Sequence, residues 1–170
     1  MPHSLWDLIG PDGLHAAKIL FGEAINHLAP FQSLETKLQG NPCVVLRLCD
    51  RNFRITHEGN FAPMLNALKM NTLKINALKM NVRVKQFDWL GSIFLPDSLF
   101  PTLVKQATVR PPHRLKTLPN HRAVPARLND IPALIWRRPL QSKPIIELHA
   151  ARTDLETLIK QYPSKKGSFS

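Results

Sequence analysis

Residues 44–56 have the sequence Val44-Val45-Leu46-Arg47-Leu48-Cys49-Asp50-Arg51-Asn52-Phe53-Arg54-Ile55-Thr56. Two runs rich in β-branched and other apolar residues flank a polar connection at residues 50–52. Such runs on either side of a short polar segment are typical of a β-hairpin. We therefore expect a small, mainly antiparallel sheet in this part of the chain.

The hairpin follows a stretch with helical periodicity. Behind the turn residues Pro11-Asp12-Gly13, apolar side chains recur three or four positions apart as far as Leu28, and Pro30 ends the pattern. This spacing predicts an N-terminal helix that packs on the sheet. Residues 31–38 predict a short second helix, which the turn residues Gly40-Asn41-Pro42 would stop.

After the hairpin, residues 68–82 form three copies of one pentapeptide: Leu68-Lys69-Met70-Asn71-Thr72, Leu73-Lys74-Ile75-Asn76-Ala77 and Leu78-Lys79-Met80-Asn81-Val82. Apolar and polar residues alternate from Leu78 to Lys85, which favours strands over residues 73–87. The copies also contain good helix formers, so a helix or a strand remains open for residues 64–77.

The C-terminal part of the chain is rich in proline, with nine between residues 96 and 144. This segment has no long periodic run, so we expect an extended arm with polyproline II character. A capping box at Thr153-Asp154-Leu155-Glu156 predicts a final helix before Pro163. The predicted fold is α+β, with an N-terminal helix packed on a small mainly antiparallel sheet, then a Pro-rich basic arm and a C-terminal helix. The predicted boundaries are a compact α+β domain at 1–95, the arm at 96–144, a strand and helix packing back on the domain at 145–163, and a flexible tail at 164–170.

The charge of the chain is strongly positive and unevenly distributed. Twenty-three Lys and Arg against twelve Asp and Glu give a net charge of +11 and a pI near 10.2. Residues 1–58 contain five basic and six acidic residues, whereas residues 59–170 contain eighteen basic and six acidic ones. A near-neutral front part followed by a basic remainder favours a scaffold with a surface for polyanionic partners.

Catalytic and metal-binding motifs are weak in this sequence. It has no Gly-rich phosphate loop, no G-x-S-x-G elbow and no H-E-x-x-H motif, and its His residues are scattered. Cys43 and Cys49 would lie roughly 20 Å apart on a strand, which predicts two buried free thiols in a reducing compartment. We therefore expect a non-catalytic protein without a metal, a cofactor or a small-molecule substrate.

The leading predicted function is contact with the phosphate backbone of RNA or DNA within a larger assembly. Arg forks on an extended arm can bind phosphate oxygens, and an aromatic side chain beside them can stack on a base. The predicted nucleic-acid-binding residues are Arg110, Arg114, Lys116, Arg122, Arg127, Trp136, Arg137 and Arg138. An auxiliary basic face is predicted at Lys69, Lys74, Lys79, Arg83 and Lys85.

Two alternative functions use the same surfaces. An assembly or adaptor subunit could dock on an acidic protein partner through the arm, and a lipid-binding module could contact an anionic membrane surface. The N-terminus has neither a basic n-region nor an apolar h-region, and no apolar run is long enough to span a membrane. We therefore expect a cytoplasmic protein.

Overall fold

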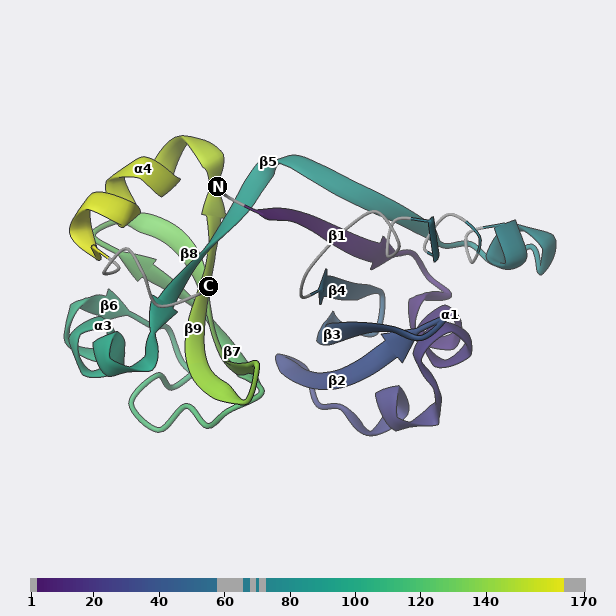
Figure 1. Ribbon diagram of the computed structural model, residues 1–170, viewed down its shortest axis with the longest axis horizontal. Helices are drawn as coiled ribbons and strands as arrows, with labels where there is room; N and C mark the ends of the chain where they lie inside the picture. Colours follow the sequence, from purple (N-terminus) through teal and green to yellow (C-terminus); the bar gives the residue numbers. More distant parts are fainter. Residues whose placement is uncertain (1–2, 58–65, 68–69, 71–72, 164–170) are drawn as a thin grey trace. The chain divides into compact units, whose positions relative to one another are not determined.

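The computed structural model describes residues 3–57, 66–67, 70 and 73–163 (Figure 1). Contacts between residues divide the chain into two compact units. The first comprises Leu5–Phe87, and the second comprises Asp88–Ser170 together with Met1–Ser4. We call them the Leu5–Phe87 unit and the Asp88–Ser170 unit. Each has its own apolar core, and strand β5 (Arg83–Pro96) begins in the first unit and continues in the second.

The Leu5–Phe87 unit is built on antiparallel strands β2 (Gln32–Leu38), β3 (Asn41–Cys49), β4 (Asn52–His57) and β1 (His3–Ile9), in that spatial order. The hairpin expected at residues 44–56 is confirmed as β3 and β4, with Val45 opposite Ile55. Val45, Phe53 and Ile55 point into the core, as the alternation of the sequence requires.

Helix α1 (Gly13–Phe21) and the 3₁₀ helix η1 (Glu23–His27) replace the single N-terminal helix predicted from the periodicity. Gly22 has a φ of 94° and separates the two. The short helix predicted at residues 31–38 is wrong, because this segment is strand β2. Leu38 pairs with Asn41, so Gln39 and Gly40 form a two-residue loop with φ values of 48° and 81°. Positive φ at both loop positions is typical of a type I′ hairpin turn.

The described residues of the pentapeptide copies do not form the predicted strand. Residues 73–77 are helical, and the predicted strand begins only at Arg83. Ile75 is buried in the core of the Leu5–Phe87 unit. Lys79 has a φ of 54°, its amide donates to the Asn76 carbonyl at 3.0 Å, and the Met80 amide donates to the Ile75 carbonyl at 3.4 Å. This pair of hydrogen bonds is a Schellman motif, which ends a helix. The prediction of strands over residues 73–82 is therefore wrong.

The Asp88–Ser170 unit contains an antiparallel sheet in the order β5, β9 (Lys143–Ala151), β8 (Ile131–Leu140), β7 (Arg122–Leu128) and β6 (Ala107–Thr108). A 3₁₀ turn, η2 (Asp97–Leu99), and helix α3 (Phe100–Gln106) connect β5 to β6. Helix α4 (Arg152–Gln161) follows β9 directly and packs against it (Figure 1). Leu155 and Leu158 of α4 join a core formed by Ile135, Ile146 and Leu148 among others.

The predicted α+β fold with a Pro-rich arm is wrong, because the chain is predominantly antiparallel β-sheet with a few short helices. Residues 96–144 contain all of β7 and β8 rather than an extended arm. The prolines of this region mostly mark the ends of elements, where a missing N–H is tolerated. Those at the first or last two positions of an element are Pro96, Pro101, Pro132, Pro139 and Pro144. The predicted tail at 164–170 lies outside the described residues.

Candidate functional site

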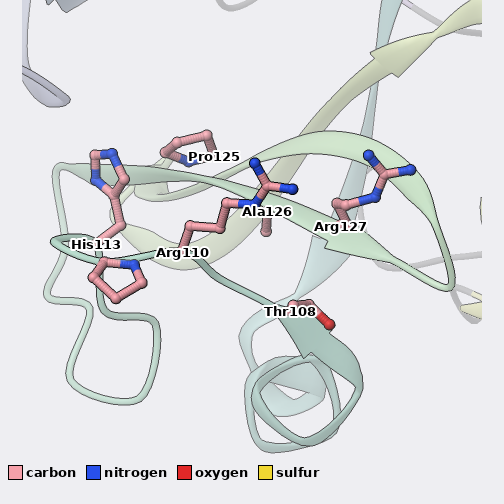
Figure 2. Close-up of a pocket in the computed structure, with 7 residues that line it drawn as sticks. Thr108, Arg110, His113, Pro125, Ala126 and Arg127 are labelled. Atoms are coloured by element: carbon pink, nitrogen blue, oxygen red, sulfur yellow. The ribbon is translucent and has the colours of Figure 1, made fainter.

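A pocket of about 420 Å³ lies in the Asp88–Ser170 unit, where three consecutive segments meet. It is lined by Thr108 at the end of β6, by Arg110 and His113 from the connection to β7, and by Arg127 with its neighbours on β7 (Figure 2). Thr108 and Arg127 are directly paired across the sheet. Paired residues of adjacent strands project from the same face, so the hydroxyl and the guanidinium lie on one wall.

A turn places the other two polar groups. The His113 amide donates a hydrogen bond to the Arg110 carbonyl at 3.1 Å, which closes a tight turn over residues 110–113. In Figure 2 the Arg110 guanidinium is drawn between His113 and Arg127, next to Ala126. The pocket therefore has polar groups from all three chain segments and an apolar wall.

The electrostatics of the pocket are positive. Two guanidiniums line it, and none of the described residues that line it is acidic. Arg127 donates to the main-chain carbonyl of Asp130 at 2.8 Å, and its Nε lies 4.0 Å from the exposed Asp130 carboxylate. An exposed ion pair at this distance offsets little of the Arg127 charge. Within the part of the chain that the structure describes, Arg110 forms no ion pair. The arrangement can bind an anion through two guanidinium forks.

Only two of the predicted nucleic-acid-binding residues, Arg110 and Arg127, line this pocket. Arg114 and Lys116 are exposed on the same connection but are not among the described residues that line it. Arg122 is half-buried and pairs with Arg137 across β7 and β8. The structure therefore does not gather the predicted set into one continuous phosphate-tracking surface.

Trp136 and Arg138 are completely buried, so neither side chain reaches a ligand at the surface. Both point to the same face of β8, and Glu147 and His149 project from the neighbouring strand β9. Arg138 Nε donates to Glu147 Oε2 at 2.7 Å, and His149 Nε2 lies 2.8 Å from Glu147 Oε1. The Arg138 guanidinium also lies 5.2 Å from the Trp136 ring centroid. These contacts make a buried polar cluster rather than a base-stacking site.

Glu147 is the acidic centre of this cluster. Burial alone would raise the pKa of Glu147, but the charges and hydrogen bonds of Arg138 and His149 outweigh it and lower that pKa to about 2. Glu147 and His149 were not among the predicted site residues, although Glu147 is the partner of both Arg138 and His149 in this cluster. Glu147 and His149 are two residues apart, as are Trp136 and Arg138. Residues two apart on a strand point to the same face, so this spacing could have predicted that each pair shares a face.

Arg137 points to the opposite face from its neighbours and has a structural partner. It forms two hydrogen bonds of 2.8 Å to the Asp97 carboxylate, and it donates to the Leu118 carbonyl at 2.9 Å. Its guanidinium lies 4.5 Å from the Phe100 ring centroid. The hydrogen bond to Asp97 raises the pKa of Arg137 above its already high ordinary value. Arg137 therefore connects β8 to the η2–α3 segment.

A second surface lies in the Leu5–Phe87 unit, and we call it the repeat face. Met70, Leu73 and Leu78 expose 55%, 64% and 58% of their surface. Lys74 and Lys79 are exposed beside them, and Arg83 and Lys85 are exposed on the first residues of β5. Lys69, also predicted for this basic face, lies outside the described residues. The sequence from residue 59 to residue 87 contains no acid, and the Asp12 carboxylate accepts a hydrogen bond of 2.6 Å from the Asn81 amide at the end of this segment.

The described residues include two free cysteines in different environments. Within the described residues there is no group of three or more His, Cys, Asp or Glu residues placed to hold a metal ion. Cys43 is buried, and burial raises the pKa of its thiol to about 12. Cys49 is exposed, which corrects the prediction of two buried thiols. A register shift in the β3–β4 ladder between Arg47 and Cys49 accompanies this exposure.

Nowhere in the described residues is a helix long and apolar enough to cross a membrane.

Comparison with solved structures places the chain among known folds. Over 94% of its length it superposes on glycine cleavage system aminomethyltransferase T from Bartonella henselae, with a TM-score of 0.71 and 11% sequence identity. Over 97% it superposes on a chain of heterotetrameric sarcosine oxidase from Corynebacterium sp. U-96, with a TM-score of 0.59 and 16% identity. It spans 42% of the aminomethyltransferase chain and 83% of the sarcosine oxidase chain. No protein-family model and no curated protein sequence matches it.

These similarities define the fold and correct the predicted class of protein. At 11% and 16% identity they concern the backbone arrangement alone. Neither structure is described as a nucleic-acid-binding protein, and neither supports an α+β fold for this chain. The assignment to a class of nucleic-acid-binding α+β proteins is therefore corrected.

Proposed function

We propose that this chain is a non-catalytic binding component of a larger assembly and that it docks on an acidic protein partner through the repeat face. The observation that carries the proposal is the combination of three exposed apolar side chains, Met70, Leu73 and Leu78, with Lys74 and Lys79 beside them. Exposed apolar groups bordered by polar residues are typical of protein interaction sites. A border rich in cations favours a negatively charged partner.

The similarity to sarcosine oxidase supports a role within an assembly. That enzyme is heterotetrameric, and this chain superposes on 83% of the length of one of its chains. A chain of this size and fold can therefore be part of a multi-chain enzyme. The same proposal places the protein in a reducing, cytoplasmic compartment, which is where the free thiols Cys43 and Cys49 would stay reduced.

A labelled synthetic peptide that forms an amphipathic helix, with Glu on one face and Leu on the other, provides the test. Fluorescence anisotropy would measure its binding to the full chain, with polyglutamate, duplex DNA and anionic vesicles as competitors. We expect saturable binding of the peptide, with weaker competition from the three polyanions because they lack the ordered apolar face. Preferential binding of duplex DNA or of vesicles would overturn the proposal in favour of a phosphate backbone or a lipid surface.

Two variants of equal charge locate the binding site. The double substitution Lys74→Glu with Lys79→Glu reverses two cations of the repeat face, and Lys37→Glu with Lys105→Glu reverses two exposed cations elsewhere. We expect the first pair to weaken peptide binding about tenfold or more and the second pair to change it by less than about threefold. Equal losses in the two double variants would show that net charge alone binds the peptide.

A third variant separates the apolar contribution from the charge. Leu73→Ser with Leu78→Ser leaves the net charge unchanged and alters side chains that are already more than half exposed. We expect it to weaken peptide binding while the thermal stability of the chain stays close to that of the parent. Unchanged peptide affinity in this variant would contradict an apolar docking face.

A further inference from the structure

We propose that the pocket of the Asp88–Ser170 unit binds the phosphoryl group of a small organic phosphate whose remaining body is apolar. The pocket belongs to a different unit from the repeat face, so this inference does not depend on the proposed docking function. Its volume of about 420 Å³ is typical of sites that hold a small molecule rather than a polymer.

The polar groups of the pocket match a tetrahedral dianion. Arg110 and Arg127 each offer a planar fork of N–H donors, which binds two oxygens of a phosphate at once. Thr108 adds a hydroxyl from the strand position directly opposite Arg127. His113 contributes an imidazole from the far side of the turn that also holds Arg110. Donors from two sides can surround three oxygens of a phosphoryl group, whereas a planar carboxylate would use fewer of them.

Two features keep the guanidiniums available for a ligand. The hydrogen bond of Arg127 to the Asp130 carbonyl uses one of its N–H groups and orients the side chain, and its other donors remain. Arg110 forms no ion pair with any residue that the structure describes. The site therefore has one cation that is oriented in advance and one that can move onto the ligand.

The remaining wall of the pocket sets the character of the ligand body. Pro111, Pro125 and Ala126 supply apolar surface next to the cations. Pro125 is exposed on the same face of β7 as Arg127, two residues away. A flat or apolar group attached to the phosphate would cover this surface, so an organic phosphate should bind more tightly than inorganic phosphate.

Isothermal titration of the full chain with phenyl phosphate, inorganic phosphate and benzyl alcohol tests this inference. We expect one saturable site for phenyl phosphate, weaker binding of inorganic phosphate, and no binding of the neutral alcohol. Absence of saturable binding up to about 10 mM phenyl phosphate, which corresponds to a very weak site, would overturn the proposal. Equal affinity for phenyl phosphate and benzyl alcohol would also overturn it, because the cations would then contribute nothing.

Matched variants assign the binding to the pocket. Arg110→Gln and Arg114→Gln remove one charge each from exposed positions of the same connection, but only Arg110 lines the pocket. We expect Arg110→Gln to weaken phenyl phosphate binding about tenfold or more and Arg114→Gln to change it less than about twofold. Thr108→Val should weaken the binding of phenyl phosphate. It should leave the folding of the chain unchanged, since Thr108 is exposed. Equal effects of the two arginine variants would mean that diffuse charge, and not the pocket, attracts the anion.

Discussion

Replacing Glu147 by Gln should destabilise the protein by about 3–5 kcal/mol, since it leaves the buried Arg138 charge without its carboxylate. Arg138 and Glu147 are completely buried and lie 2.7 Å apart, Nε to Oε2. Glutamine has nearly the same shape as glutamate, so packing changes little and the measured loss reports the charge. With a urea m-value of about 2 kcal/mol/M, the unfolding midpoint should fall by about 2 M.

The pH dependence of stability gives an independent measure of the same interaction. The folded pKa of Glu147 is about 2, below the ordinary value of 4.5, so the carboxylate binds protons more weakly in the folded state than in the unfolded state. Its contribution is fully present above about pH 5 and is lost as the pH falls through 4.5 toward 2. A difference of about 2.5 pH units corresponds to about 3 kcal/mol, which agrees with the loss expected from the substitution. Because Glu147→Gln has no carboxylate at this position, the variant should lose less stability than the parent as the pH falls from about 5 toward 2.

A matched control and a compensating variant complete the experiment. Glu23 forms an exposed pair with Lys18 at 3.2 Å, so Glu23→Gln should cost less than about 1 kcal/mol. Combining Glu147→Leu with Arg138→Met removes both buried charges and should recover much of the stability lost in Glu147→Gln. A loss below about 1 kcal/mol for Glu147→Gln, measured by urea unfolding and circular dichroism, would refute the view that these charges depend on each other.

Two further substitutions, each with a matched control, test backbone geometry in the Leu5–Phe87 unit. In Gly10→Ala the new Cβ would lie 2.2 Å from the Asn81 carbonyl oxygen, and we expect thermal and urea unfolding to show a loss of about 2–4 kcal/mol. At Gly40 φ is +81° and nothing lies within 4 Å of the new Cβ, so Gly40→Ala should lose only the stability that backbone strain costs, which is smaller. Equal losses of stability in Gly10→Ala and Gly40→Ala would exclude the clash at Gly10. Lys79→Gly should raise the free energy of unfolding by about 1 kcal/mol by relieving positive φ at the helix end. Lys74→Gly within the same helix should lower it by about 1 kcal/mol, and a loss in both variants would argue against the Schellman motif.

The parts of the fold that the sequence predicts are those with local signals. The β3–β4 hairpin was predictable because two apolar runs flank the polar residues 50–52. The β7–β8 and β8–β9 hairpins were missed, although each has a two-residue loop with positive φ at both positions. These loops are Asn129-Asp130 and Gln141-Ser142. Asn and Asp tolerate such conformations, but Gln and Ser give no clear turn signal.

Proline content misled the prediction for residues 96–144 because proline has two structural meanings. In an unpaired segment it favours polyproline II, and at the end of a strand it simply removes one donor from the ladder. Pro139 and Pro144 face each other next to the loop of the β8–β9 hairpin, so their missing donors fall where the ladder begins. Only the pairing partner distinguishes these cases, and that partner lies outside any local window of sequence.

The choice of candidate site failed in part for a related reason. Arg137 and Arg138 are adjacent in the sequence, yet on a strand their side chains point to opposite faces. Arg137 donates to the Asp97 carboxylate on one face, and Arg138 donates to the Glu147 carboxylate on the other. Arg110 and Arg127, in contrast, lie on a connection and on an exposed strand position, and no carboxylate among the described residues approaches either within 4.0 Å except that of Asp130. The net charge of +11 therefore overstates the charge available to a ligand. We expect binding to depend on cations without a buried carboxylate partner, and Arg110 and Arg127 at the pocket and Lys74 and Lys79 on the repeat face are among them.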